Sequence, residues 1–302
     1  MSPAPDAPDF VQTYLDTPSL PALKLPTGSC DTHVHVLGPL DRFPYAQANG
    51  PKRGPAPAPA PKERLFALHR RMGIERCVIV QTVNHGYDNG VVEDAIEAGG
   101  GRYLGIARVT LDVTDRELQR LADRGFRGVR FNFMRHLVGG ESPQEVVALT
   151  ERLAARGLHL QVHFESELVH TVGQALRASR VPVVIDHMGR VDARLGESHP
   201  DFQALMGLLE QPGFHVKVSG IDRIDATCRA GQGYPAGVLL AARLVERFPD
   251  QCLWGLDWPH PNHTHVPDDG ELVDALARIA PSAATLEKLL VHNPQALYRF
   301  AV

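Results

Sequence analysis

The sequence lacks the features that would place it in a membrane or in an oxidising compartment. No run of about 18 apolar residues occurs, so no transmembrane helix is expected. The first 26 residues contain five prolines before position 22 and no apolar core of a signal peptide. Four cysteines lie far apart without a C-x-x-C pair: Cys30, Cys77, Cys228 and Cys252. We therefore expect reduced cysteines, a cytoplasmic location and no membrane partner.

The sequence also lacks a surplus of basic residues. Lys and Arg number 31 against 35 Asp and Glu, which gives a net charge of −4. A nucleic acid is therefore not expected as the main partner. No G-x-G-x-x-G pattern follows an apolar run, which disfavours a dinucleotide-binding fold. The hydrophobic share of 43% is that of a globular protein with a sizeable core, and the 15 histidines are the unusual count.

Eight short apolar runs recur along the chain and read as buried strands. Their starts lie 24 to 47 residues apart, which is too long for hairpins and suits strand–helix–strand crossovers. The runs cover residues 30–36, 77–81, 103–109, 128–133, 159–164, 183–189, 214–220 and 252–258.

The intervals between these runs carry helix signals. Ser142, Pro143 and Glu145 form a capping box with proline at the first helical position, and Thr114 with Glu117 repeats the pattern. Another helix is expected before Phe248 from the apolar stripe of Leu239, Leu240, Leu244 and Val245. Strands alternating with helices predict an α/β fold, a (β/α)8 TIM barrel, with an open doubly wound sheet as the alternative.

Two segments lie outside this alternation. We expect residues 1–26 to form an extended arm and residues 27–302 to form a single barrel domain. The proline–alanine segment 54–61 cannot form a helix or a central strand and is predicted to be a polyproline-like loop. It follows the first strand, where barrel loops surround the catalytic face, so it either covers the site or serves as a solvated spacer.

Polar side chains gather at the expected carboxyl ends of the strands. Alternation puts Asp31, His33 and His35 on one face of the first strand. Further candidates end the fifth, sixth and eighth strands: His163, His187 and Asp257. Imidazoles with a carboxylate suit a zinc ion and activation of its bound water. The same groups could instead polarise a carbonyl while Asp257 acts as general base, and both interpretations stay open.

Arginines near these positions predict an anionic substrate. Arg130 shares the inward face of the fourth strand with Asn132, and a guanidinium matches a carboxylate in two hydrogen bonds. Arg190 follows His187, and Arg223 lies just beyond the seventh strand. Lys217 is expected to balance Asp31 or another buried carboxylate. The histidines of the last loop, His260, His263 and His265, are expected to be solvated, because their spacing fits no standard metal pattern.

The order of these residues resembles the amidohydrolase superfamily, from about Gly28 to Phe300. Finer motifs resemble its 2-pyrone-4,6-dicarboxylate lactonase branch, and they stand at residues 78–81, 85–89, 127–133, 185–190, 257–262 and 292–294. The resemblance implies hydrolysis of a lactone in a barrel that also hosts decarboxylases. It also implies that Asn262 contacts the substrate.

The sequence departs from that branch at several positions. The lactonase has a tyrosine where this chain has His163, which restores the more usual metal-binding pattern. The lactonase is metal-independent. Most members of the superfamily with two metals carry a bridging Lys or Glu on the fourth strand, where this chain has Arg130 and Asn132, so at most one zinc is expected. Two substrate-binding positions are Val83 and His136 here, which puts the dicarboxylate specificity in doubt.

We therefore predict a hydrolase that opens a carboxylate-bearing lactone, such as a pyrone dicarboxylate or a sugar-acid lactone. Asp257, His187, His33 and His35 are the predicted catalytic residues, with Asp257 activating water. The predicted substrate contacts are Arg130, Arg223, Asn132, Arg190 and Asn262. One zinc on His33, His35, His163 and Asp257 is the predicted cofactor, and catalysis without metal is the other possibility. The alternatives are a zinc-dependent non-oxidative decarboxylase on the same site and a non-enzymatic ligand-binding barrel.

Overall fold

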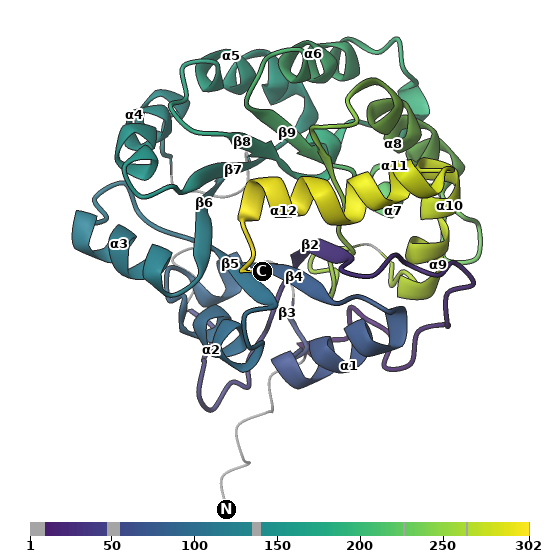
Figure 1. Cartoon of the computed structure of the whole chain (residues 1–302), viewed down its shortest axis with the longest axis horizontal. Helices are drawn as coiled ribbons and strands as arrows, with labels where there is room; N and C mark the ends of the chain where they lie inside the picture. The colour runs from purple at the N-terminus through teal and green to yellow at the C-terminus, as the bar shows by residue number, and fades with distance from the viewer. Residues whose placement is uncertain (1–9, 47–54, 135–139, 226, 264, 302) are drawn as a thin grey trace, which may run out of the picture.

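All eight predicted strand regions form strands, and these strands make one parallel sheet (Figure 1). The computed structural model describes residues 10–46, 55–134, 140–225, 227–263 and 265–301. The order of the strands is β10-β9-β8-β7-β6-β5-β4-β2. Their bounds are β2 Cys30–Val34, β4 Arg76–Val80, β5 Tyr103–Ala107, β6 Phe126–Phe133, β7 His159–Phe164, β8 Val183–Ile185, β9 Phe214–Lys217 and β10 Cys252–Leu253.

Backbone hydrogen bonds close the sheet between its first and last strands. The amide of Thr32 donates to the carbonyl of Trp254 (2.9 Å), and the amide of His35 donates to the carbonyl of Trp258 (2.7 Å). The amide of Asp257 donates to the carbonyl of His33 (2.7 Å). Because these bonds continue the β2 ladder past the end of β10, the sheet is a barrel. The predicted (β/α)8 fold is confirmed, and the open-sheet alternative is wrong.

Helices cover the outside of the barrel and begin where the capping signals predict. Ser142 forms the complete capping box with Glu145, and the hydroxyl of Thr114 accepts a hydrogen bond from the Glu117 amide. Leu239 does not belong to the predicted apolar stripe, since its side chain is 57% exposed while Leu240 and Leu244 are buried. The bounds of the two remaining strands and of the α-helices are β1 Phe10–Val11, β3 Ala56–Pro57, α1 Lys62–Met72, α2 Gly90–Ala98, α3 Asp115–Asp123, α4 Pro143–Ala154, α5 Val172–Leu176, α6 Pro200–Leu209, α7 Ile221–Ile224, α8 Pro235–Arg247, α9 Asp269–Asp274, α10 Leu276–Ile279, α11 Ala283–Glu287 and α12 Asn293–Tyr298. Within the described ranges, no helix has both the length and the apolarity to cross a bilayer.

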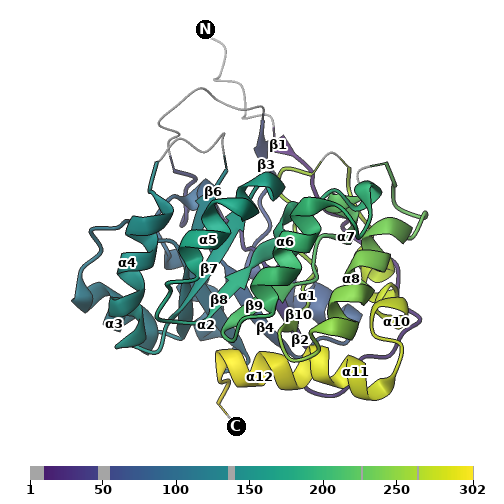
Figure 2. The ribbon, with the colours of Figure 1, turned by 90° about the horizontal axis from the view of Figure 1, so that it is seen from above.

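The C-terminal segment closes the end of the barrel where the strands begin. Helix α12 lies across that end, opposite β1 and β3 (Figure 2). Tyr298 and Phe300 pack against inward-facing side chains of the first strands, including Cys30, Val78 and Leu104. This apolar cluster fills the half of the barrel where the strands begin. The polar inward-facing residues therefore lie toward the other end, where the strands finish.

The N-terminal arm and the proline–alanine segment pair with each other beside that mouth. β1 and β3 form a two-residue parallel pair, and the amide of Ala58 donates to the carbonyl of Val11 (2.8 Å). The segment is therefore not only loop: alternate alanines supply the amides that the prolines lack. Residue 54 lies outside the described residues. The hydroxyl of Tyr14 donates to the carbonyl of Pro59 (2.9 Å), and its ring packs on Trp258 (5.2 Å between centroids), which places the arm on the loop after β10.

Candidate active site

The first strand presents two histidines to the mouth of the barrel, but Asp31 does not join them. The pairing register of β2 with β4 shifts between Asp31 and Val34, so simple alternation fails at this point. Asp31 turns outward, where its carboxylate lies 3.5 Å from Nε2 of His69 on α1. Gly255 allows this close strand contact, because a Cβ there would lie 2.5 Å from the His33 amide nitrogen. The predicted shared face therefore holds for His33 and His35 alone.

Three imidazoles meet one oxygen of Asp257. Its Oδ1 lies 3.3 Å from Nε2 of His35, 3.6 Å from Nε2 of His33 and 3.7 Å from Nε2 of His187. All four side chains are buried. The structure thus brings together four of the predicted site residues from the first, sixth and eighth strands.

The hydrogen bonds behind these rings decide which nitrogens carry protons. Nδ1 of His35 lies 2.7 Å from the carbonyl of Val80 and can only donate to it, so the neutral ring has a bare Nε2. Nδ1 of His33 lies 3.2 Å from the carboxylate of Asp186 and 3.3 Å from Nζ of Lys217, so its contacts do not fix the tautomer of this ring. Burial and the charge of Lys217 lower the pKa of His33 to about 3, so this ring is neutral near pH 7. The Nε2 atoms of His33 and His35 and a carboxylate oxygen therefore face one point.

This arrangement fits a single cation. Nε2 of His33 and Oδ1 of Asp257 are buried without a hydrogen-bond partner, and the donor atoms of His33, His35 and Asp257 all lie within 4.8 Å of one another. Tetrahedral zinc with bonds of about 2.0–2.1 Å separates its ligands by about 3.3–3.5 Å. His163 does not belong to this group. Its ring stands edge-on to His187, with 5.4 Å between centroids, and its Nε2 is buried without a partner.

A buried charge network lies beneath the histidines. Nε of Arg130 donates to Oδ2 of Asp186 (2.8 Å), and Nζ of Lys217 lies 3.7 Å from Oδ1 of the same carboxylate. Burial alone would raise the pKa of Asp186, but Arg130, His33 and Lys217 hold it well below its usual value. Lys217 therefore balances a buried carboxylate, as expected, and that carboxylate is Asp186 as well as the more distant Asp31.

The other predicted substrate contacts differ in their partners and burial. Nη2 of Arg223 donates to Oδ2 of Asp257 (2.6 Å), so this arginine already has a carboxylate partner inside the protein. Burial lowers the pKa of Arg190 to about 10, with the charge of Arg223 adding to the effect. Asn132 has a buried amide nitrogen without a partner, whereas Asn262 is exposed. Val83 begins a short 3₁₀ turn, and His136 lies outside the described residues.

The histidine-rich loop after β10 is not solvated, contrary to expectation. Nε2 of His260 lies 3.0 Å from Oδ1 of Asp269, and both side chains are fully buried. His263 lies between two carboxylates, 2.9 Å from Asp222 and 3.2 Å from Asp257. His265 lies 3.3 Å from Asp222. The sequence spacing matched no metal pattern, but the partners of these histidines are acidic residues on α7, α9 and the eighth strand, which spacing along one loop cannot reveal.

The backbone at this mouth adopts an uncommon conformation. The expected strand 183–189 ends at Ile185, and residues 186–190 form a turn in which His187, Met188 and Arg190 have φ of 47°, 51° and 55°. The loop after β10 repeats the feature at Asp257, His260 and Asn262, with φ of 67°, 57° and 63°. Such left-handed residues are costly for side chains other than glycine, and they cluster at functional sites.

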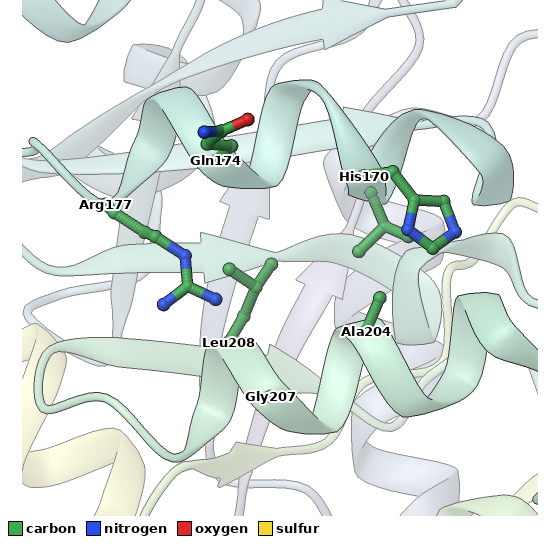
Figure 3. A pocket seen from close by; sticks show the side chains of 7 residues that line it. His170, Gln174, Arg177, Ala204, Gly207 and Leu208 are labelled. Atoms are coloured by element: carbon green, nitrogen blue, oxygen red, sulfur yellow. The ribbon is translucent and has the colours of Figure 1, made fainter.

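The surface pockets do not by themselves mark the site. A pocket of about 410 Å³ lies on the outside of the barrel between α5 and α6 (Figure 3), and it contains none of the predicted site residues. A second pocket of about 410 Å³ lies between the β6–α4 connection and α5, with Asn132 on its wall. The convergence of buried charges, rather than hollow volume, identifies the site.

A (β/α)8 barrel with histidines from β2 and an aspartate after β10 at its carboxyl-end mouth defines a class of barrel hydrolases. The amidohydrolase family model matches residues 30–300, and the chain belongs to this family.

Curated relatives match almost the whole chain. A 2-pyrone-4,6-dicarboxylate hydrolase of Comamonas testosteroni is 41% identical over 99% of this chain and 98% of its own length. A 4-sulfomuconolactone hydrolase of Hydrogenophaga intermedia is 37% identical over 91% of this chain and 89% of its own. The crystal structure of a probable 2-pyrone-4,6-dicarboxylic acid hydrolase from Acinetobacter baumannii with citric acid bound superposes with a TM-score of 0.76. It is 26% identical and covers 91% of this chain and 100% of its own. The resemblance inferred from the motifs is confirmed.

Proposed function

We propose that this protein is a lactonase that hydrolyses an anionic lactone, of the pyrone-dicarboxylate or muconolactone type, formed in the breakdown of aromatic compounds. The observation that carries the proposal is the buried Asp257 carboxylate, which faces three imidazoles and pairs with Arg223. Arg130 lies close by, since it pairs with Asp186, which also contacts His33. The hydrolases of similar sequence act on lactones by name, and their full-length coverage supports the same reaction here.

In the proposed reaction, Asp257 accepts a proton from a water molecule while the oxygen of that water attacks the lactone carbonyl carbon. The ring C–O bond then breaks, and the leaving oxygen takes up a proton to give an acyclic acid. His187 is the imidazole suited to donate to the carbonyl oxygen directly. Nδ1 of His187 lies 2.9 Å from the hydroxyl of Ser219, which can donate to it and leave the proton on Nε2.

The arginines and amides hold the charged substituents of the substrate. Arg130 uses Nε for Asp186, so its two terminal nitrogens are the ones proposed to bind a substrate carboxylate. Further contacts are proposed for Arg223, Arg190, Asn132 and Asn262.

A single zinc ion is the proposed cofactor, held by His33, His35 and Asp257. The donor atoms of these three residues are close enough together to bind one tetrahedral ion. His163 would become the fourth ligand if its side chain turned toward them. When bound, the ion supplies a Lewis acid for the carbonyl or lowers the pKa of a bound water. The protein as purified without chelator should then contain one equivalent of zinc by elemental analysis.

The reaction is tested by following base consumption with a panel of lactones. 2-Pyrone-4,6-dicarboxylate, 4-sulfomuconolactone and a sugar-acid lactone are compared with their neutral methyl esters where these exist. Proton release with the charged lactones and little with the esters supports the proposal. Release of carbon dioxide from a matching carboxylic acid, without lactone opening, would contradict it and favour the decarboxylase alternative.

A further inference from the structure

A buried chain of carboxylate, imidazole and carboxylate leads away from the active site, and the proposed reaction does not use it. Asp222 on α7 lies 2.9 Å from Nδ1 of His263, whose Nε2 lies 3.2 Å from Oδ2 of Asp257. The three side chains are at most 1% exposed. Nε2 of His265 lies 3.3 Å from the same oxygen, Oδ2, of Asp222.

An ion-pair contact and a hydrogen bond account for this chain better than a second metal ion does. The donor atoms of Asp222, His263 and His265 also lie within 4.8 Å of one another. However, the 2.9 Å separation between Nδ1 of His263 and Oδ2 of Asp222 is shorter than the roughly 3.3 Å between ligands of tetrahedral zinc, so the two groups are in direct ion-pair contact. The other ring nitrogen, Nε2, forms the hydrogen bond to Oδ2 of Asp257 at 3.2 Å.

The two oxygens of Asp257 have different surroundings. Oδ2 accepts from Nη2 of Arg223 at 2.6 Å and faces Nε2 of His263 at 3.2 Å, whereas Oδ1 faces the three imidazoles of the site. The torsion that rotates a carboxylate about its Cβ–Cγ bond is broad and has no strong intrinsic preference. Donors on Oδ2 therefore decide where Oδ1 points.

We propose that His263 is a positioning residue, which Asp222 holds in place and which fixes the rotation of the Asp257 carboxylate so that Oδ1 faces the substrate. This inference rests on the proposed role of Asp257 in lactone hydrolysis. Arg223 alone does not fix the rotation, because it also donates to the carbonyl of Pro261 at 3.3 Å and reaches Asp257 through one nitrogen.

The test compares His263→Leu, which removes both ring nitrogens, with His263→Gln, which keeps an N–H donor of similar reach. Misplacing a catalytic group by about 1 Å costs up to ~10²-fold in rate, so His263→Leu should lower kcat by ~10–100-fold. KM should change by less than ~3-fold, since His263 contacts the base rather than the proposed substrate contacts. His263→Gln should recover most of the lost kcat. Asp222→Leu should lower kcat, and adding His263→Leu to it should cause little further loss, because both act through one chain.

His170, which pairs with Asp201 at 2.9 Å on the outer surface, provides the matched control. His170→Leu and His170→Gln should leave kcat unchanged, and thermal unfolding reports whether each variant is folded. A folded His263→Leu with wild-type kcat, or a Gln variant as slow as the Leu variant, would overturn the proposal. If His263→Leu does not fold, His263→Gln and Asp222→Asn are compared with the wild type instead. A normal kcat in Asp222→Asn would then contradict the proposed positioning role.

Crystal structures of the wild type and His263→Gln or His263→Leu give a readout that needs no turnover. A rotated Asp257 carboxylate in the Leu variant supports the positioning role, and an unchanged one refutes it. If the wild type opens no lactone, the proposed function fails, while these structures still decide what His263 does.

Discussion

Replacing Asp257 by asparagine tests the proposed mechanism with little change of shape. Arg223 and His263 both act on Oδ2, so the amide oxygen of the variant should stay on that side, where it can still accept. The amide NH₂ then points at the bare Nε2 atom of His35 and can donate to it. The fold should therefore survive, because a buried lone pair gains a donor.

The chemistry should not survive, since an amide cannot take a proton from water. We expect Asp257→Asn to lower kcat by ~10²–10⁴-fold, which is about 2.7–5.4 kcal/mol in the activation barrier. Base consumption at saturating lactone measures kcat, circular dichroism and thermal unfolding check the fold, and elemental analysis follows the zinc. Asp201→Asn, which alters a carboxylate paired with His170 on the outer surface, is the matched control. Turnover within ~10-fold of the wild type in the folded variant would refute the role of Asp257.

The remaining predictions concern the substrate anion, the metal and a buried histidine. Arg130→Met should cost ~2–5 kcal/mol in kcat/KM for the charged lactone and much less for its neutral ester. Arg130→Lys should preserve stability better, because it keeps a cation beside Asp186. Equal losses on both substrates would show that Arg130 is purely structural. Dialysis against a chelator should abolish activity and added zinc should restore it, and full activity without metal would contradict the zinc proposal. Burial lowers the pKa of His159 to about 3, so the unfolded chain binds one more proton between about pH 3 and 6.5 and stability falls as the pH drops through this range. His159→Leu should therefore flatten the pH dependence of the free energy of unfolding by ~1.4 kcal/mol per pH unit near pH 5, measured with urea, and parallel curves would contradict this.

The barrel could be predicted because its signals are local. Capping at Ser142 and Thr114 depends on residues three positions apart, and each buried strand is a continuous apolar run. Strand alternation correctly placed His33 and His35 on one face. It misplaced Asp31, because the pairing register of β2 shifts between Asp31 and Val34. The ends of strands were harder to place, since the sixth strand stops at Ile185 where the left-handed turn begins.

The partners of the site residues could not be read from the sequence. Arg130 was correctly identified as a strand-interior cation that needs an anion, yet the sequence does not reveal that Asp186 provides one. His263 was expected to be solvated because the spacing of the loop histidines fits no standard metal pattern. Its burial depends on Asp222, some 40 positions earlier in the chain, which only the barrel brings to the same place.

The left-handed turns at the mouth set a limit on how this protein can be made more thermostable. Six residues with positive φ other than glycine lie in two short turns: His187, Met188, Arg190, Asp257, His260 and Asn262. Each costs the native state about 1 kcal/mol or more relative to glycine, so random libraries selected for heat resistance alone should accumulate glycines and asparagines there. Four of these six positions are proposed to bind or react with the substrate, so that selection would remove side chains the reaction needs. Engineering for stability should therefore leave both turns unaltered and target exposed positions on the outer helices, such as Leu239.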